Sequence, residues 1–345
     1  MAATNRAWRL RRRPAGEARV GDLELVEEEI GELADGQALV KTKLLSLDPT
    51  NRIWMSDIRG YMPPVPIDAV MRGLGIGEVV ESRRDDMPVG ALVSGFLCWQ
   101  EYCLADDSLL EAPLTVLPDP LPGPESAFLG ALGHTGVTAY IGCDLADLRE
   151  GDTVVISAAC GAVGGVAGQV AKQRGAGRVV GIAGGPEKCA HAVEKLGYDA
   201  CVDHRADDWR DQLDAATPDG IDVDFENVGG PIMDHILGRL NIGARVVLCG
   251  MIAEYNTYNE GGEHSGGLSN IGQLIMQRAT IQGFLVLDYG HRFEEAIGYL
   301  GGLLGEGKLH YDETIVDGGI DVAVDTLAEL FDGRNMGKLL VRVSD

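Results

Sequence analysis

A glycine-rich segment, SAACGAVGGVAGQVAK at residues 157–172, has the composition and the position of a nucleotide-binding turn. It follows an apolar run at 152–158 and leads into a helical pattern whose apolar residues share one face. Glycines between a strand and a helix let backbone N–H groups and the helix N-terminus approach a pyrophosphate. The spacing is A-x-x-G-x-x-G on Ala158, Gly161 and Gly164 instead of G-x-G-x-x-G. The segment therefore predicts dinucleotide binding, and the alternative is a tight turn whose small residues serve packing alone.

The residues after the next expected strand, 178–183, indicate which dinucleotide is bound. An NAD site usually has an Asp or Glu about 20 residues beyond the glycines, where it binds the ribose hydroxyls. Here two glycines follow the strand, and the basic residues Lys188 and Arg205 lie further on. Open space and positive charge suit a 2′-phosphate, so we expect NADP(H) as the cofactor. The acidic neighbours Glu187 and Asp203 weaken this preference, and a simple helix-start role for Lys188 is the alternative.

The seven cysteines form no recognisable metal or redox motif. They are scattered, none precedes Cys98, and no C-x-x-C spacing occurs. We therefore expect no metal ion, although carboxylate–histidine sites, which no motif arranges, stay open as an alternative. We also expect reduced thiols in a cytoplasmic protein. The sequence has no signal-peptide pattern and no apolar stretch of about 18 residues, so we expect neither secretion nor a membrane span.

The expected elements change character along the chain, and its 345 residues suit two domains. Up to about residue 125 there are short strands between turns, as at 38–47 and 76–82, which suggests a barrel or sandwich. Beyond about residue 130, strands alternate with helical patterns. This alternation predicts an α/β fold with a doubly wound parallel sheet. The strands of that sheet are expected at 152–158, 178–183, 200–203, 222–227 and 244–250.

The charge balance excludes some classes of partner. There are 29 basic and 53 acidic residues, which gives a net charge of −24. A nucleic-acid binder needs clustered Lys and Arg to neutralise phosphates, and an anionic membrane surface repels an acidic protein. We therefore expect a small-molecule partner, with no nucleic acid and no membrane.

Several motifs in order resemble one family nearly from end to end. They include LSLDPTNR (45–52), GVTAY (136–140), ENVGG (226–230), CGMIAEYN (249–256) and NMGKLLVRV (335–343), in addition to the glycine-rich turn. The chain resembles the zinc-free branch of the medium-chain dehydrogenase/reductase superfamily, the NADPH-dependent alkenal, prostaglandin and curcumin double-bond reductases. The resemblance implies a GroES-like β-barrel domain at 1–130, completed by 311–345, and a Rossmann-type NADP-binding domain at 131–310. It also implies a homodimer.

The resemblance further implies a set of cofactor-binding residues. The glycine turn is expected to hold the pyrophosphate, Lys188 and His204 to meet the 2′-phosphate, and the others to line the rest of the cofactor. They are Gly161, Ala162, Val163, Gly164, Lys188, His204, Asn227, Cys249, Gly250, Met251, Ile252, Tyr255, Phe284, Leu285, Val286 and Asn335.

Three positions depart from the pattern of these relatives. Thr50 stands in D-P-T-N-R where relatives commonly have Tyr, so the role of that Tyr does not transfer. His204 stands where relatives often have a Tyr at the 2′-phosphate, and Arg205 is a possible second donor there. His134, in LGHTG, adds a titratable group near the expected cleft.

The reaction implied is reduction of the C=C bond of an α,β-unsaturated ketone or aldehyde, by hydride transfer from NADPH to the β-carbon and without zinc. Negative charge then develops on the carbonyl oxygen, where the protein must place a hydrogen-bond donor. We expect Tyr255 to be that donor and Arg52 to position the substrate at the pocket wall. The alternatives are that Tyr255 packs or binds the ribose, and that Arg52 pairs structurally with Asp48 or Asp57.

Further interpretations stay open. Trp54, Met55, Tyr61 and Met62 suit an apolar pocket rim, or a loop packed against the partner domain. The polar loop at 256–268 suits a lid over the substrate, or a disordered surface segment. A quinone reductase of the same superfamily and a non-catalytic NADPH-binding protein are the alternative functions.

Overall fold

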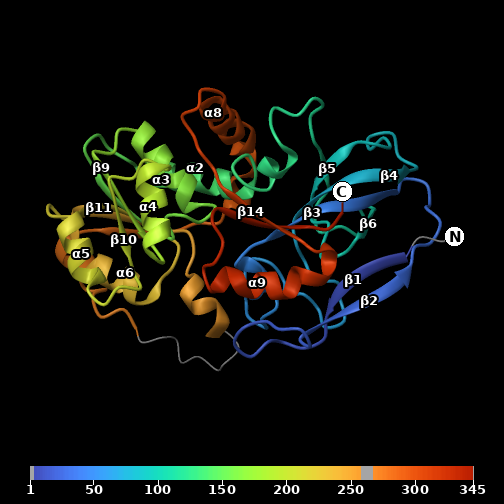
Figure 1. The fold of residues 1–345 in the computed structure, drawn as a ribbon, viewed down its shortest axis with the longest axis horizontal. Helices are drawn as coiled ribbons and strands as arrows, with labels where there is room; N and C mark the ends of the chain where they lie inside the picture. The colour runs from blue at the N-terminus through green and yellow to red at the C-terminus, as the bar shows by residue number, and fades with distance from the viewer. Residues whose placement is uncertain (1–3, 258–266, 345) are drawn as a thin grey trace.

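Two sheets of different construction divide the chain between them (Figure 1). The computed structural model describes residues 4–257 and 267–344. One sheet is wholly parallel and the other is mostly antiparallel. This confirms the α/β class with a second, β-rich domain.

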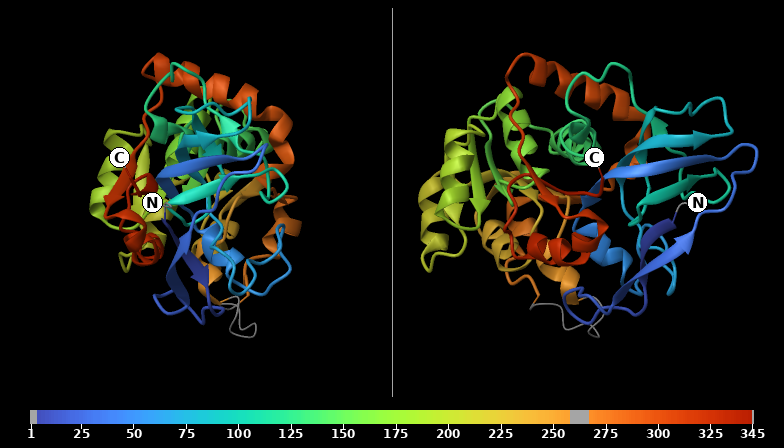
Figure 2. Two further views of the ribbon diagram at one scale, coloured as in Figure 1. Left: turned by 90° about the vertical axis from the view of Figure 1, so that its right-hand side faces the viewer. Right: turned by 45° about the vertical axis from the view of Figure 1, so that its right-hand side comes forward.

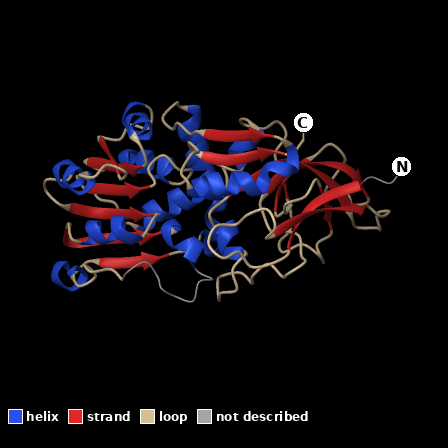
Figure 3. Ribbon diagram, turned by 60° about the horizontal axis from the view of Figure 1, so that its bottom comes forward, coloured by secondary structure: helices blue, strands red, loops and turns tan. Residues whose placement is uncertain are grey.

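The parallel sheet has the doubly wound arrangement that the strand–helix alternation predicts (Figure 3). Its strand order is β10 (Ala200–Asp203), β9 (Arg178–Ala183), β8 (Thr153–Ser157), β11 (Ile221–Glu226), β12 (Leu240–Leu248) and β13 (Thr280–Gly283). One face packs against α2 (His134–Leu145), α3 (Gly164–Gln173), α4 (Pro186–Glu194) and α8 (Phe293–Gly305). The other face packs against α5 (Trp209–Ala216), α6 (Gly230–Leu237) and α7 (Gln273–Gln277).

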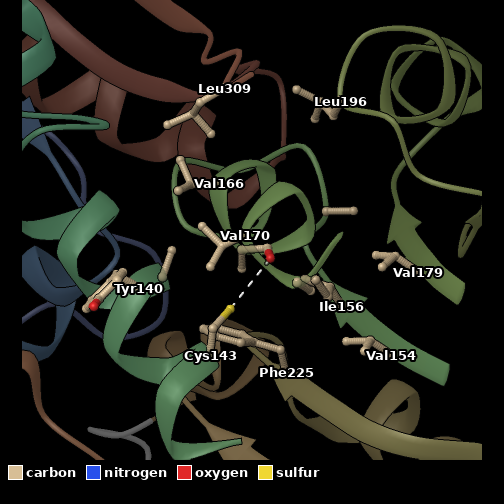
Figure 4. Close-up of a cluster of buried hydrophobic side chains, with 14 of the residues drawn as sticks. Tyr140, Cys143, Val154, Ile156, Val166, Val170, Val179, Leu196, Phe225 and Leu309 are labelled. Atoms are coloured by element: carbon tan, nitrogen blue, oxygen red, sulfur yellow. Dashed lines mark hydrogen bonds between the residues drawn. The ribbon is translucent and has the colours of Figure 1, made fainter. Parts of the chain in front are cut away.

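The alternation of side chains along β8 explains how one strand serves both cores. Val154 and Ile156 belong to the cluster under α2 and α3, whereas Val155 belongs to the cluster on the opposite face. Figure 4 shows the first cluster, in which the Cys143 thiol of α2 donates to the carbonyl of Ala167 in α3 at 3.6 Å. Both faces are apolar, so the strand is buried as a continuous hydrophobic run.

The second sheet joins the beginning of the chain to its end. Its order is β14 (Glu313–Asp317), β15 (Lys338–Arg342), β3 (Ala38–Leu47), β4 (Gly75–Ser82), β5 (Leu92–Gly95) and β7 (Thr115–Val116), and β6 (Tyr102–Ala105) also pairs with β3. β15 runs antiparallel to β3, with Leu340 opposite Ser46. The C-terminal segment, red in Figures 1 and 2, therefore returns from the parallel sheet to complete the first domain.

A separate hairpin of β1 (Thr4–Leu10) and β2 (Leu23–Glu29) covers the outer side of this domain. The indole of Trp8 donates to the carbonyl of Ile320 at 2.7 Å, and Arg6 pairs with Asp321. The hairpin is thus anchored beside α9 (Ala323–Phe331). The sequence analysis did not predict these two strands, nor β13 and β14.

The short helical elements lie near the boundary between the domains. They are α1 (Thr50–Trp54), η1 (Glu125–Phe128), η2 (Ile252–Thr257), η3 (Val286–Arg292) and η4 (Gly319–Val322). Within the described residues, no helix is long and apolar enough to cross a bilayer.

Candidate active site

A cleft of about 620 Å³ lies between the two domains. The residues that follow the carboxyl ends of β8, β9, β10, β11 and β12 all contribute to its wall. In a doubly wound sheet this edge is where ligands bind. The opposite wall comes from the end of β3, from α1 and from the C-terminal segment at 330–339.

The glycine-rich turn after β8 forms a close-fitting cradle in this cleft. Ala158 has a φ of +51° and its carbonyl accepts a hydrogen bond from the N–H of Gly161 at 2.8 Å. A Cβ at Gly164 would collide with that same carbonyl oxygen, so this position requires glycine. Helix α3 begins at Gly164, and Gly161, Ala162, Val163 and Gly164 line the cleft. A helix N-terminus bare of side chains is suited to a pyrophosphate.

Basic side chains gather at one end of the cleft, beyond β9 and β10. Lys188 donates through Nζ to the carbonyl of Asn335 at 2.5 Å, and desolvation lowers the pKa of its ammonium group. Arg205 donates to the carbonyl of Asp332 at 2.8 Å. Because these partners are uncharged carbonyls, the positive charge of this end is available for an anionic ligand.

One acid at this end, Asp203, is engaged by backbone N–H groups. The carboxylate of Asp203 accepts the backbone N–H of Gly185 at 2.7 Å and that of Arg205 at 3.0 Å. It is thus held by the backbone of the turn. His204 also lines the cleft, and burial followed by the neighbouring Arg205 lowers the pKa of its imidazole. The donor set suits a 2′-phosphate.

The middle of the cleft contains Asn227 and Tyr255. The Asn227 amide donates to the carbonyl of Ser157 at 2.8 Å, which holds the side chain at the end of β8. The phenol oxygen of Tyr255 accepts the N–H of Met251 at 3.0 Å. This bond orients the Tyr255 ring within η2.

The far end of the cleft is apolar, with a few hydroxyl groups. Its wall includes Trp54 and Phe96, whose rings meet edge to face with centroids 6.0 Å apart. Thr50 and Tyr61 also line it, and their hydroxyls are hydrogen-bonded to each other. Partial desolvation raises the pKa of the Tyr61 phenol. Tyr61, predicted as part of an apolar rim, therefore contributes a polar group as well.

His134 lines the cleft at the start of α2 and stacks edge to face on Phe293. Desolvation lowers the pKa of its imidazole, so the ring is neutral at neutral pH. Cys160 and Cys249 also line the cleft, and burial raises the pKa of each thiol to about 12. Protonated thiols are poor nucleophiles and poor metal ligands.

Most of the predicted cofactor residues lie together in the cleft. Its lining includes all of the sixteen positions given above except Met251. Met251 contributes its N–H to Tyr255, while its side chain packs over Gly229. A side-chain role for Met251 at the cofactor is therefore not supported.

The position of Arg52 differs from the prediction. Its side chain is fully buried and is not among the residues that line the cleft. The guanidinium donates to the carbonyls of Gly16 at 2.8 Å and Asn256 at 3.3 Å, and to the Ser56 hydroxyl at 2.6 Å. These contacts join α1 to the chain near residue 16 and to η2. The geometry favours a structural role for Arg52, in place of the predicted contact with substrate.

Two parts of the site were missed by sequence reasoning. The carbonyl of Asp332 and the side chain of Lys338 come from the C-terminal segment, far from the glycine turn in sequence. Lys338 donates to Asp48 Oδ1 at 2.9 Å and is 2% exposed. A lysine that begins the largely apolar run KLLVRV was the available signal. Of the expected lid at 256–268, residues 258–266 lie outside the described residues.

Comparison with known proteins places the chain in a family. The family model described as the N-terminal domain of oxidoreductase matches residues 6–112, and the one described as zinc-binding dehydrogenase matches residues 162–300. The NADPH-dependent curcumin reductase of Escherichia coli (strain K12) is 42% identical over 99% of this chain and 97% of the relative. The chain belongs to the medium-chain dehydrogenase/reductase superfamily. Within it the chain lies in the branch of double-bond reductases, and it is an oxidoreductase.

Two further relatives in this superfamily agree with that placement. The 2-alkenal reductase (NADP(+)-dependent) of Nicotiana tabacum is 36% identical over 89% of this chain and 87% of the relative. The crystal structure of CurA from Vibrio vulnificus in complex with NADPH matches with a TM-score of 0.91 at 38% identity, covering 99% of both chains. The second family model is described as zinc-binding, but this sequence contains no C-x-x-C motif.

Proposed function

We propose that this protein reduces the C=C bond of α,β-unsaturated ketones and aldehydes with NADPH, by hydride transfer to the β-carbon and without a metal ion. The cofactor is NADP(H). The observation that carries the proposal is the single cleft with a basic end, a glycine cradle and an apolar, hydroxyl-bearing end. The relatives named above act on substrates of this chemical class.

The residues of the cleft fit the cofactor. The turn from Gly161 to Gly164 would hold the pyrophosphate, because it lines the cleft at the N-terminus of α3. Lys188, Arg205 and His204 would meet the 2′-phosphate. Bound there, the reduced nicotinamide supplies the hydride.

The apolar end suits the substrate. Trp54 and Phe96 provide surface for a hydrocarbon chain or an aromatic ring. As the β-carbon accepts hydride, negative charge develops on the carbonyl oxygen, and a phenol nearby stabilises it by donating a hydrogen bond. Tyr255 is the proposed donor. Tyr61, whose phenol stays protonated because its pKa is raised, is a second donor at the substrate end.

The side chains that line the cleft support a reaction without a metal ion. In the described part of the chain, the His, Cys, Asp and Glu side chains spaced for shared metal binding are His191, His310 and Asp312, which lie outside this cleft. Asp48, at the cleft wall, is neutralised by Lys338 and accepts the Ser46 hydroxyl at 2.5 Å. Hydrogen-bond donors, rather than a Lewis acid, therefore stabilise the oxyanion in this proposal.

The proposal includes a cytoplasmic homodimer. All seven cysteines are free thiols, as suits a reducing compartment. β13 forms one edge of the parallel sheet, and beside it on α7 Ile275 is 78% exposed and Met276 64% exposed. If two chains paired along their β13 edges across a twofold axis, the strand edge and the exposed side chains of α7 would both be covered. Light scattering should give twice the chain mass of 36.7 kDa, and a monomer would contradict it.

The experiment that tests the proposed function is NADPH oxidation, followed by absorbance, with a small panel of acceptors. The panel contains a 2-alkenal, a long-chain enone, a quinone and a saturated aldehyde, each repeated with NADH. We expect turnover of the alkenal or enone with a preference for NADPH. Turnover of the quinone alone, or NADPH binding without turnover of any acceptor, would contradict the proposal.

A further inference from the structure

Two imidazoles and a carboxylate meet behind the glycine-rich turn, outside the active-site cleft. His191 lies on α4, and His310 and Asp312 lie in the segment between α8 and β14. Nε2 of His191 is 2.7 Å from Asp312 Oδ2, and Nε2 of His310 is 3.1 Å from Asp312 Oδ1. One ligand atom from each side chain lies within 4.8 Å of the others. Three potential metal ligands from two separate parts of the chain thus converge on one point.

The backbone that carries these ligands is firmly held. The amide of Gln169, buried in α3, donates to the carbonyl of His310 and accepts its N–H, both at 2.7 Å. The carbonyl of Asp312 accepts the N–H of Lys338 at 2.8 Å. These contacts fix the two ligands of the segment relative to α3 and β15. A metal ion would therefore bind without ordering a loose loop, which favours affinity.

The surroundings leave room for a fourth ligand. The side chains of His191 and Asp312 are 19% and 21% exposed, whereas that of His310 is 50% exposed. The site is thus closed on the protein side and open to water on the other. Two histidines, one carboxylate and one water form a common tetrahedral ligand set for Zn²⁺. The net charge of −24 also raises the local concentration of cations.

The contrast with another His–Asp pair in the same chain supports a ligand role. His235 is 2.9 Å from Asp214, but Arg239 also contacts that carboxylate at 3.2 Å. The charge of Asp214 is thus neutralised by a guanidinium. Among the described residues, the ion pairs of Asp312 are with His191 and His310 and include neither Lys nor Arg. Its charge is available to a cation.

We propose that His191, His310 and Asp312 form a binding site for one Zn²⁺ ion per chain. Without the ion, the Nε2–H of each histidine donates to Asp312. With zinc bound, each histidine would present the Nε2 lone pair, with its proton on Nδ1, and one oxygen of Asp312 would complete the protein ligands. The site joins α4 to the segment that leads into β14. Lys188 lies one helical turn before His191, and its partner Asn335 precedes the strand that pairs with Asp312. Zinc therefore stabilises the elements that present the basic end of the cleft, and takes no part in the reaction.

The experiment is calorimetric titration of ZnCl₂ into the full chain at pH 7.5, after removal of metals with EDTA. The variants are His191→Gln and His310→Gln, and the matched control is His235→Gln, whose side chain has the same 19% exposure as that of His191. We expect one zinc per chain in the wild type and in the control. His191→Gln and His310→Gln each remove one of the three protein ligands, so each variant should bind zinc at least about tenfold more weakly than the wild type. Zinc should raise the Tm of the wild type and the control, and raise that of the two variants much less.

Cobalt distinguishes this site from one made by cysteines. Co²⁺ bound by the wild type should give visible d–d bands without a thiolate charge-transfer band, and both His variants should lose them. Unchanged zinc affinity in the two variants, a thiolate band, or no zinc binding by the wild type would overturn the proposal. Far-ultraviolet circular dichroism of the metal-free variants checks that they are folded. The metal-free protein should keep its reductase activity, so failure of the zinc site and failure of the proposed function are separate results.

Discussion

Lys188, whose ammonium group is partly desolvated, is the residue on which the proposed preference for a phosphorylated cofactor depends. Its partner in the structure is a neutral carbonyl, so a phosphate would gain the full charge-assisted contact. Lys188→Ala should raise the KM for NADPH by roughly tenfold or more, the equivalent of about 1.5–3 kcal/mol. The KM for NADH, which has no 2′-phosphate, should change little. Steady-state kinetics with both cofactors measures this.

The control for that variant is Lys172→Ala, on α3. Lys172 forms an ion pair with Asp199 at 2.5 Å and is not among the residues that line the cleft. Its loss should leave the KM for NADPH unchanged. An unchanged KM in Lys188→Ala as well would remove Lys188 from the phosphate site.

Tyr255 is the residue on which the proposed stabilisation of the oxyanion depends. Tyr255→Phe removes the phenol oxygen, and with it the contact with the N–H of Met251, but keeps the aromatic ring. We expect kcat to fall by roughly 10²-fold, as for loss of one oxyanion donor, with little change in the KM for NADPH. Tyr61→Phe is the comparison and should chiefly raise the KM for the enone. Wild-type kcat in Tyr255→Phe would exclude it from the mechanism.

Residue types and spacing predict the cofactor half of the site better than the substrate half. The glycine turn and Lys188 are local to one strand–helix unit, so their positions follow from the motif. Arg52 lies on the short helix α1 and Tyr61 on the irregular segment after it, and their directions depend on contacts with Asn256 and with Thr50. Such contacts bring together residues that no sequence period relates, and so Arg52 was predicted in the pocket although it is buried behind it.

Strand β11 contains a feature that opposes stability. Asp224 is fully buried between Val155 of β8 and Val246 of β12, and neither of its carboxyl oxygens has a hydrogen-bond partner in the described structure. Desolvation, and then the charge of Glu226, raises the pKa of Asp224 well above its ordinary value. The folded state therefore keeps a proton that the unfolded state releases once the pH exceeds the ordinary carboxyl range.

The sign of the resulting pH dependence follows from this difference. Because the folded state binds more protons, its stability falls as the pH rises from about 4 toward the raised pKa. Asp224→Val matches the β-branched neighbours and should increase the free energy of unfolding at pH 8 by about 1–3 kcal/mol. It should also reduce the loss of stability between pH 5 and pH 8. Urea unfolding at several pH values measures both effects.

A matched variant separates charge from polarity at this position. Asp224→Asn removes the titration but keeps a buried polar group, so it should flatten the pH dependence with a smaller gain in stability. If neither variant changes the slope, Asp224 does not titrate differently in the folded protein. Glu226, whose pKa burial also raises, is present in both variants.

At the scale of elements, buried strands were predictable and the N-terminal hairpin was not. β8, β9 and β10 are apolar runs between turn signals, and they lie where the sequence places them. β1 and β2 instead pair through charges, such as Arg6 with Glu27 and Arg9 with Glu28. The apolar pairs of the hairpin, Trp8 with Leu25 and Leu10 with Leu23, are few and lie among these charges, so period-based reasoning finds little signal there.

At the scale of the whole molecule, the cleft exists because the chain crosses between its domains twice. The first crossing leads from β7 through η1 into α2, and the second leads from α8 into β14. The apolar run KLLVRV predicts β15, but its pairing with β3 depends on contacts between distant parts of the sequence. The second crossing supplies Asn335 and Lys338 to the cleft. The positions of Asn335 and Lys338 in the cleft could therefore not be predicted from the spacing of residues in the sequence and are known from the folded structure.

The central claim is hydride transfer to the β-carbon of an enone, and isotope tracing tests it most directly. The enzyme is supplied with NADPH deuterated at the transferable C4 position and with an enone, and the product is analysed by NMR and mass spectrometry. We predict a saturated ketone with one deuterium on the β-carbon and a solvent hydrogen on the α-carbon. Deuterium on the carbonyl carbon, in an unsaturated alcohol, would contradict the account.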